Sequence, residues 1–296
     1  MPSDSRIAFV TCEEGPDLHA DDRLAADALQ RRGFRVSPAV WSDPGINWRR
    51  FAAVVIRAPW DYHRDPVRYA AWLRRCEIDG VNLWNPAAAV LANLDKRYLA
   101  DFEDAGVAII PIEYVERGQR QSLGTLLERR HWTRAVVKPA VSASAYGTWR
   151  TSAETATSDQ ARWDDEVMRH SLLVQPFADE IVTSGEWSIV FFGGEYSHAV
   201  LKTPAAGDFR VQEELGGRPS AQDPPSALVE QARRVLLQVA GPLLYARVDG
   251  VERDGVFHLM ELEVNEPFLY LGMSRGAATR FADAIVRALP GQSVDG

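Results

Sequence analysis

The stretch that decides the fold reads "HLMELEVNEP" and covers residues 258–267. Glu261, Glu263 and Asn265 recur at every second position, with aliphatic residues between them. Because a β-strand directs alternate side chains to opposite faces, this spacing predicts a strand with one apolar face and one face that carries two carboxylates and a carboxamide. Charge of one sign beside an apolar core is costly unless it is paired, so the strand needs a partner of opposite charge.

The preceding stretch, "LLYARVDGVERDGVF", predicts the other strand of a hairpin that turns near Asp254-Gly255. An odd number of loop residues would place Arg247 and Asp249 on the face of the carboxylates, whereas a two-residue turn would separate them. We expect the odd loop, because Asp249, Glu263 and Asn265 would then offer the oxygen ligands that Mg²⁺ prefers. The alternative is the solvated polar face of an edge hairpin. Arg247 suits either interpretation, as a phosphate ligand or as a salt-bridge partner.

The composition narrows the class of protein. A chain of 296 residues predicts two or three packed subdomains, and 46% apolar with 25% charged residues is usual for a soluble globular protein. A net charge of -8 without a cluster of Lys and Arg argues against nucleic-acid binding. Two cysteines outside any CxxC pair, no signal peptide and no apolar run of about 18 residues predict a cytoplasmic protein without a membrane span.

Strand and helix patterns alternate in the first 92 residues, which predicts an open parallel α/β sheet. A helix that contains Lys96 is expected over residues 93–106, followed by a short strand over 107–111. Two β-rich runs around Gly193-Gly194 predict a second hairpin, because glycine tolerates the positive φ angles of a tight turn.

Two lysines stand out because the chain has neither a GxxxxGK[ST] loop nor a GxGxxG motif. Lys96 lies in "NLDKRYL", and Lys138 ends a predicted strand directly before a loop of small residues, 142–147. A lysine at this place is suited to hold phosphate charge while loop amides close over it. The alternative for Lys138 is an ordinary lysine at a strand end.

Together these pieces resemble the ATP-grasp superfamily, in particular the group that contains glutathione synthetase, D-alanine–D-alanine ligase and the ribosomal-protein glutamate ligases. The motifs occur in the order "NLDK", "VVKPAVSASAYG", "LLVQPF", "KTPAAGDFRVQ", "ARVDG" and "LMELEVNEP" within residues 93–267. The resemblance implies an ATP-grasp fold of the α/β (α+β) class in three parts. These are an N-terminal open parallel α/β sheet domain (1–92), a small central lid domain (93–176) and a C-terminal grasp domain with the metal-binding hairpin (177–296).

The resemblance also implies a role for individual residues. The expected ATP-binding residues, with the backbone of Phe177 and Ala178 reading adenine and Glu180 the ribose, are Lys96, Lys138, Ser142, Ser144, Gly147, Gln175, Pro176, Phe177, Ala178 and Glu180. The expected Mg²⁺ ligands are Asp249, Glu263 and Asn265, and the expected catalytic cations are Lys202, Arg210 and Arg247. Two features depart from the family pattern: the lid loop is rich in Ser and Ala rather than Gly, and Gln175 stands where Glu is common.

Enzymes of this superfamily activate a carboxylate as an acyl phosphate, which an amine then attacks, with release of ADP and phosphate. The tip of the third predicted strand, "RAPWDYHRD", lies where open α/β sheets usually bind ligands. The candidate substrate contacts are Glu13, Arg57, Trp60, Asp61, Tyr62, His63 and Glu266. The alternatives are a surface position for Glu13 and His63 and a carboxylate partner within the sheet for Arg57.

Three longer stretches, "APWDYHRDP", "GEWSIVFFGGEYSHAVLKTPAAGDFRVQ" and "MELEVNEP", are similar to a subgroup that includes D-cycloserine synthetase. That similarity implies a small amino-acid-like substrate, O-ureido-D-serine, which is cyclised within one molecule to D-cycloserine. The alternatives are a ligase that joins two amino acids or modifies a peptide end, and a nucleotide-binding module without catalysis. Relatives in the superfamily are often dimers or tetramers, so a homo-oligomer is expected.

Overall fold

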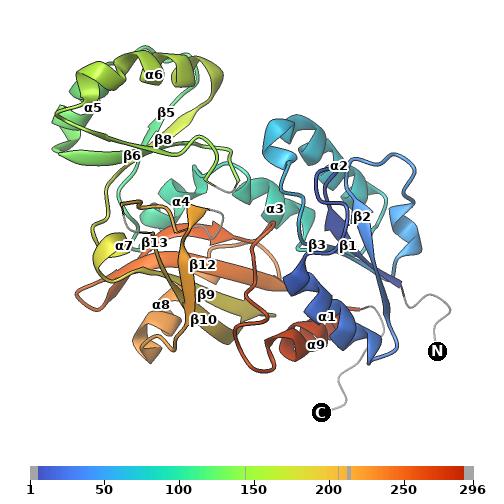
Figure 1. Cartoon of the computed structure of the whole chain (residues 1–296). Helices are drawn as coiled ribbons and strands as arrows, with labels where there is room; N and C mark the ends of the chain where they lie inside the picture. The colour runs from blue at the N-terminus through green and yellow to red at the C-terminus, as the bar shows by residue number, and fades with distance from the viewer. Residues whose placement is uncertain (1–5, 144, 206, 212–214, 290–296) are drawn as a thin grey trace.

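Three β-sheets with surrounding helices make up the computed structural model, which describes residues 6–143, 145–205, 207–211 and 215–289 (Figure 1). One sheet is parallel, and the other two are antiparallel. The predicted mixed α/β class is confirmed. Within the described ranges, none of the helices combines the length and the apolar character needed to span a bilayer.

The N-terminal sheet is parallel and has the strand order β2-β1-β3-β4, as the alternation of strands and helices predicted. Asp65 caps the second helix by accepting a hydrogen bond from the Arg68 amide, and Gly80 follows its end with φ +65°. The elements of this region are β1 (Arg6–Thr11), α1 (Ala20–Gln30), β2 (Arg35–Val40), β3 (Ala53–Ile56), α2 (Pro66–Ile78), β4 (Leu83–Trp84) and α3 (Ala87–Asn93).

The last helix of the chain, α9 (Ala277–Arg287), lies beside α1 (Figure 1). Phe281 of α9 and Leu29 of α1 belong to one buried cluster with Phe9 of β1. An ion pair between Arg32 and Asp283, with Nε 2.9 Å from Oδ1, joins the two segments at the edge of that cluster. The C-terminal part of the chain therefore shares a core with the N-terminal sheet.

An antiparallel sheet with the order β5-β8-β6-β7 and two helices on one side forms the part shown at the top of Figure 1. Its core is built around Trp163, Leu126 and Val174, which are buried. We call this part the upper sheet. Its elements are β5 (Glu113–Val115), α5 (Leu123–Arg130), β6 (Arg134–Pro139), β7 (Trp149–Ser152), α6 (Ala156–Arg169) and β8 (Leu172–Pro176).

Of two local predictions before the upper sheet, the helix is confirmed only over its second part and the strand is wrong. Lys96 lies in a turn between α3 and α4 (Tyr98–Asp104), because the Asp95 carboxylate accepts from the Arg97 amide at 2.9 Å and bends the chain. Residues 107–111 form no strand, and only Ile109 makes an isolated bridge. The segment is too short to pair further and ends at a proline, which has no amide hydrogen to donate.

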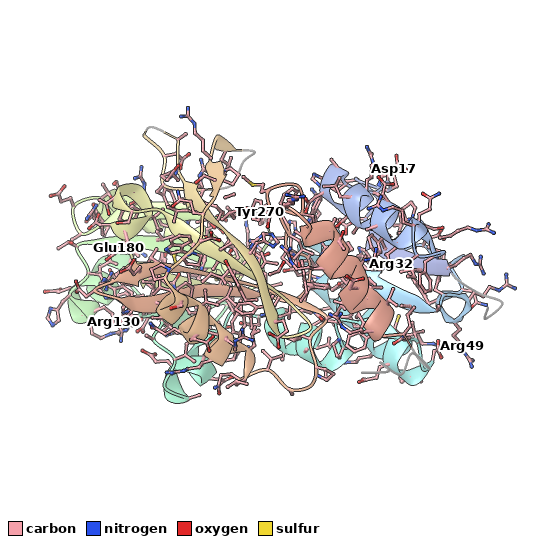
Figure 2. All side chains as sticks on the ribbon, turned by 90° about the horizontal axis from the view of Figure 1, so that it is seen from below. Asp17, Arg32, Arg49, Arg130, Glu180 and Tyr270 are labelled. Atoms are coloured by element: carbon pink, nitrogen blue, oxygen red, sulfur yellow. The ribbon has the colours of Figure 1, made fainter. Side chains whose placement is uncertain are left out.

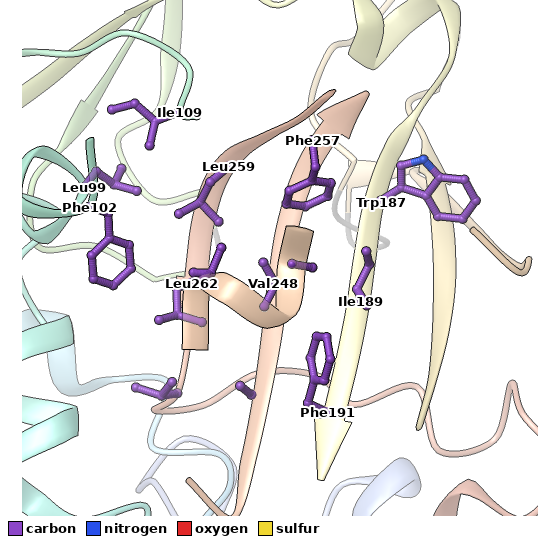
Figure 3. Close-up of a cluster of buried hydrophobic side chains, with 14 of the residues drawn as sticks. Leu99, Phe102, Ile109, Trp187, Ile189, Phe191, Val248, Phe257, Leu259 and Leu262 are labelled. Carbon is purple, nitrogen blue, oxygen red and sulfur yellow. The ribbon is translucent and has the colours of Figure 1, made fainter. Parts of the chain in front are cut away.

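The C-terminal sheet is antiparallel with the order β11-β10-β9-β12-β13. The predicted tight turn at Gly193-Gly194 is confirmed, with φ +59° and +81°. One face packs Ile189, Phe191, Val248 and Leu262 against α4 and α8 (Figure 3). The elements are α7 (Glu180–Thr183), β9 (Glu186–Phe192), β10 (Glu195–Thr203), β11 (Arg218–Ala221), α8 (Ser226–Leu236), β12 (Tyr245–Arg253) and β13 (Val256–Glu263).

A buried histidine on β10 predicts a pH dependence of stability. Burial lowers the pKa of His198 to about 4, and Nε2 lies 2.9 Å from the Leu269 carbonyl oxygen. Since the unfolded chain takes up this proton near pH 6.5, the stabilisation is present above that pH and is lost as the pH falls towards 4, at most about 3 kcal/mol. Urea unfolding at pH 7 and pH 4.5 should show a flatter pH dependence in His198→Gln than in the wild type. An unchanged slope would contradict the assignment, and His170→Gln controls for the loss of a histidine elsewhere.

Candidate active site

The face of the C-terminal sheet opposite its apolar core carries a row of charged side chains. Asp249 on β12 lies opposite Glu261 on β13, and Arg247 lies opposite Glu263. Across the sheet, Lys202 on β10 lies opposite Glu186 on β9. We call these six residues the charged face. The prediction that Arg247 and Asp249 share a face with the carboxylates of the last strand is confirmed.

The expected reason for this arrangement is wrong, because the hairpin turn has two residues and not an odd number. Arg253 pairs with Val256 across Asp254-Gly255, and a β-bulge at Met260 then adds one residue to β13. The extra residue restores the alignment that a two-residue turn alone would have lost. The burial pattern agrees, because Leu259 before the bulge and Leu262 after it both enter the apolar core.

Asp249 is hydrogen-bonded to three other side chains. Its carboxylate accepts hydrogen bonds from Arg247 Nε at 2.9 Å, Lys202 Nζ at 3.2 Å and Ser188 Oγ at 2.7 Å. Burial opposes its ionisation, but Arg247 and Lys202 lower its pKa to about 2. Lys202 also donates to Glu186 at 2.5 Å. Asp249 is therefore a fixed anion at the centre of the charged face.

Two neighbouring carboxylates behave differently. Burial raises the pKa of Glu263 to about 7, and the Asp249 and Glu261 carboxylates add to this effect although Arg247 opposes it. Burial likewise raises the pKa of Glu266 to about 8, with a further contribution from Glu263. A buried carboxylate that is hard to ionise without a counter-charge becomes a favourable ligand when a cation is bound beside it.

Two lysines approach the charged face from the upper sheet and from the turn before α4. Lys96 Nζ lies 3.1 Å from Glu261 Oε1 and donates to the Ser142 carbonyl oxygen at 2.9 Å. Lys138 forms no ion pair with any residue of the described part of the chain, and burial lowers its pKa. A buried lysine outside any direct ion pair is suited to bind an anionic ligand.

The charged face forms the floor of a cavity of about 360 Å³, a size within the usual range for small-molecule sites. One end, the apolar end, is lined by Ile110, Val136, Ala178, Ile181, Val211 and Met260. The other end, the aromatic end, is lined by His19, Trp60, Phe268 and Tyr270 together with Glu266. The predicted site residues that line the cavity are Trp60, Lys96, Lys138, Ser142, Gln175, Pro176, Ala178, Lys202, Arg210, Arg247, Asp249, Glu263 and Glu266.

Three other residues predicted to bind ATP, Gly147, Phe177 and Glu180, do not line this cavity. Gly147 lies against Pro139, whose Cγ would be 2.8 Å from an added Cβ, and Ser144 lies outside the described residues. The Phe177 amide donates to the Arg134 carbonyl oxygen at 3.0 Å, so a base contact by Phe177 would have to use its carbonyl oxygen. Glu180 pairs with Arg253, with Oε1 2.6 Å from Nε.

Five of the seven candidate substrate contacts do not line the cavity, and each of the five has a protein partner. Arg57 is buried and donates to Asp22 at 2.8 Å and to the Pro267 carbonyl oxygen at 2.9 Å, so it has a carboxylate partner, which lies on helix α1 and not within the sheet. The remaining four that do not line the cavity each have a protein partner: Glu13 with Ser42, Asp61 with Trp41, Tyr62 with the Ser142 carbonyl, and His63 with the Trp60 carbonyl.

The cavity residues without a role in the sequence-based prediction include His19, Glu186, Glu261, Phe268 and Tyr270. Glu261 belongs to the alternating acidic pattern, and Phe268 and Tyr270 follow it directly. His19 follows β1, at the carboxyl end of a parallel strand, which is a usual ligand position. Figure 2 shows Tyr270 beside the N-terminal part of the chain, with Glu180 far from it.

The side-chain oxygens of the charged face are of the kind that Mg²⁺ prefers, but they are too few to fill its coordination shell. Within the described residues, no group of three or more His, Cys, Asp and Glu side chains is arranged to hold a metal. Mg²⁺ commonly takes one or two carboxylates and completes its shell with water and phosphate oxygens, which Asp249 and Glu263 would allow. Asn265 is buried outside the cavity lining, where its Oδ1 accepts from Tyr69 at 2.6 Å and its Nδ2 has no partner. If the side-chain amide of Asn265 is turned over, its nitrogen faces Tyr69 and its oxygen becomes available to a cation.

The position of Glu180 leads to a prediction about nucleotide affinity. Since its carboxylate pairs with Arg253 and does not line the cavity, Glu180→Gln should change the KM for ATP by less than about threefold. Steady-state ADP release at varied ATP concentration tests this. A tenfold or larger increase in KM with unchanged kcat would instead support the ribose contact expected from the sequence.

Comparison with known proteins identifies the family of this chain. Residues 7–85 match the family model for the N-terminal domain of D-cycloserine synthetase DcsG. The chain is 31% identical to the cycloserine biosynthesis protein DcsG of Streptomyces lavendulae over 304 residues, which is 96% of this chain and 98% of that protein. The crystal structure of D-cycloserine synthetase DcsG has a TM-score of 0.84 at 28% identity, over 96% of this chain and 99% of that one.

A more distant structure shares the fold. The ATP-grasp ligase PsnB, solved with a phosphomimetic variant of its minimal precursor, Mg and ADP, has a TM-score of 0.67 at 16% identity. That likeness covers 96% of this chain and 98% of that chain, and at this identity it bears on the fold alone. The predicted ATP-grasp fold is confirmed.

Proposed function

Because this chain belongs to the D-cycloserine synthetase family of ATP-grasp ligases, we propose that it cyclises O-ureido-D-serine to D-cycloserine with ATP as the activating substrate. The observation that carries the proposal is the likeness to DcsG over 96% of the chain. The cavity of about 360 Å³ suits a small substrate whose reacting groups belong to one molecule.

The charge of each cavity residue determines which part of the substrates it would bind. Lys138 and Lys96 neutralise the phosphates of ATP at the edge of the charged face, and the apolar end accepts the base. Asp249 and Glu263 would hold Mg²⁺, which would supply positive charge to phosphate oxygens when it is bound. Arg247 and Lys202 face the substrate carboxylate and the transferred phosphate. Although burial disfavours its charge, the Asp249 and Glu186 carboxylates raise the pKa of Lys202 above its usual value, so it stays a cation.

The proposed reaction has three steps, and its atoms balance. Transfer of the γ-phosphate to the substrate carboxylate gives an acyl phosphate and ADP. The ureido nitrogen attached to oxygen then attacks the acyl carbon, the five-membered ring closes and phosphate leaves. The carbamoyl group departs with one water molecule as carbamic acid, which yields ammonia and carbon dioxide. Exclusion of water from the cavity protects the acyl phosphate until the ring closes.

The test is turnover with single and paired substrates. The purified protein is incubated with ATP, Mg²⁺ and a panel of amino acids that includes O-ureido-D-serine, and the release of ADP, phosphate and ammonia is measured. ADP and ammonia in equal amounts with O-ureido-D-serine alone support ring closure. ADP release that needs two amino acids or a peptide, without ammonia, would identify a bimolecular ligase. ATP binding without any ADP release would identify a nucleotide-binding module.

A further inference from the structure

His19 is placed at the aromatic end of the cavity by the start of helix α1. It is the N-cap residue of α1, and its Nδ1 accepts a hydrogen bond from the Asp21 amide at 3.3 Å. A ring nitrogen that accepts a hydrogen bond cannot carry the ring proton, so the proton of the neutral ring lies on Nε2. The ring therefore offers an N–H donor on the edge away from the helix.

Two aromatic rings fix the orientation of this donor. The His19 ring makes edge contacts with Trp60 at a centroid distance of 5.5 Å and with Phe268 at 4.9 Å. Nε2 of His19 forms no hydrogen bond with another residue of the described ranges, although the ring lines the cavity. The neighbouring Trp60 indole is already used, since its Nε1 donates to the Glu266 carbonyl oxygen at 3.3 Å. His19 is thus an oriented donor without a protein acceptor.

We propose that His19 determines specificity for the ureido group by donating from Nε2 to the ureido carbonyl oxygen of the substrate. This inference rests on the proposed function. O-ureido-D-serine has three polar groups, and its carboxylate must lie at the charged face where phosphate arrives. Its ammonium group needs an acceptor, which Glu266 supplies as a cavity carboxylate that forms no ion pair with a described residue. The ureido carbonyl is the remaining acceptor and matches the donor of His19.

The geometry gives His19 a binding role and not that of a general base. A base at Nε2 would require the proton on Nδ1, and that would break the hydrogen bond from the Asp21 amide. Protonation of both nitrogens would also remove the acceptor and weaken the helix cap. His19 therefore contacts the substrate as a fixed donor, and it should affect how well the ureido group is recognised.

Two substitutions separate the helix cap from the donor. Asparagine is a good N-cap residue whose side chain reaches about as far as Nδ1, so His19→Asn keeps the cap and removes the donor. Glutamine caps poorly but its amide reaches about as far as Nε2, so His19→Gln weakens the cap and keeps a donor. Two substrates complete the design: O-ureido-D-serine, and O-amino-D-serine, which lacks the carbamoyl group. The second would close the same ring by attack of its aminooxy nitrogen on the acyl phosphate, with release of ADP and phosphate only.

We expect His19→Asn to lower kcat/KM for O-ureido-D-serine by about 10- to 100-fold and for O-amino-D-serine by less than about threefold. His19→Gln should retain more activity with O-ureido-D-serine than His19→Asn, in spite of a lower melting temperature. Equal losses with both substrates, or no loss with either, would overturn the role of His19. Wild-type protein that turns over neither compound would instead refute the proposed function, so the two failures are distinguishable.

Discussion

Glu263→Gln is expected to lower ADP formation at least 100- to 1000-fold while the protein remains folded. The substitution keeps the shape of the side chain and removes its charge from the charged face. Glu263 pairs with Arg247 and lies opposite it in the sheet, so it is one of the two carboxylates placed to hold a cation against phosphate oxygens. ADP release with the best substrate of the panel, at saturating ATP, is the measurement.

Although Glu263→Gln should lower ADP formation, it should raise the stability of the folded protein at neutral and higher pH. The pKa of Glu263 is raised to about 7 by burial, so ionising it in the folded protein is unfavourable. Stability from this group is full below the unfolded pKa near 4.5 and is lost as the pH rises through 7. Arg247 keeps Asp249 as a partner in the variant. Glu263→Gln should therefore be as stable as the wild type at pH 4.5 and more stable above pH 7.

The controls for Glu263→Gln separate the metal from the fold. Nucleotide binding is measured by calorimetry with and without Mg²⁺: the wild type should gain affinity from Mg²⁺, and the variant should gain much less. Glu180→Gln, which removes a carboxylate outside the cavity, should behave as the wild type in the same assay. ADP formation above one tenth of the wild-type rate would refute the role of Glu263 as a metal ligand.

Local patterns in the sequence predict what a single strand or turn decides. Alternation along "ELEVN" places Glu261 and Glu263 on one face because neighbouring side chains in a strand point to opposite sides. The turn at Gly193-Gly194 is equally local. The sequence also predicts the two lysines that approach the charged face, since Lys96 and Lys138 belong to short motifs that occur in the family order.

Contacts between distant segments could not be predicted in the same way. Arg57 pairs with Asp22 and with the Pro267 carbonyl oxygen, which are 35 and 210 positions away, and nothing near "RAPWDYHRD" indicates either partner. His19 is a single histidine in a polar loop, and only the packing of Trp60 and Phe268 around it shows its place. Polar residues at a strand tip are therefore poor guides to which of them face a cavity.

The bulge in the last hairpin is the clearest case, because the correct face was predicted for a wrong reason. A two-residue turn would place Asp249 opposite Met260, and the extra residue of the bulge places it opposite Glu261. Met260 is an ordinary strand residue and gives no signal. The signal lies on the other strand, at Gly250, where the register changes.

Gly250→Ala is therefore expected to have the second large effect, on stability and on activity together. An added Cβ would lie 2.5 Å from the His258 carbonyl oxygen and 2.6 Å from Phe257 Cζ. The carbonyl oxygen is part of the strand pairing and cannot move aside as a flexible side chain can. Overpacking of this kind costs about 1–3 kcal/mol, and more where backbone must shift, so we expect the upper part of that range. Urea unfolding at pH 7 measures it.

Activity should fall further than stability alone explains, because relief of the clash changes the spacing between β12 and β13 beside the bulge. Asp249 then leaves its position opposite Glu261, and ADP formation should drop at least 100-fold at a temperature where the variant is still folded. Gly124→Ala in helix α5 is the matched control, since an added Cβ there lies 3.7 Å from Ala156 Cβ and Ser122 Oγ and should be neutral or slightly stabilising. A Gly250→Ala protein with wild-type stability and ADP formation would show that the bulge does not set the register of the charged face. Lost activity at wild-type stability would show that the strands accommodate the methyl group while the alignment of Asp249 with Glu261 is what catalysis requires.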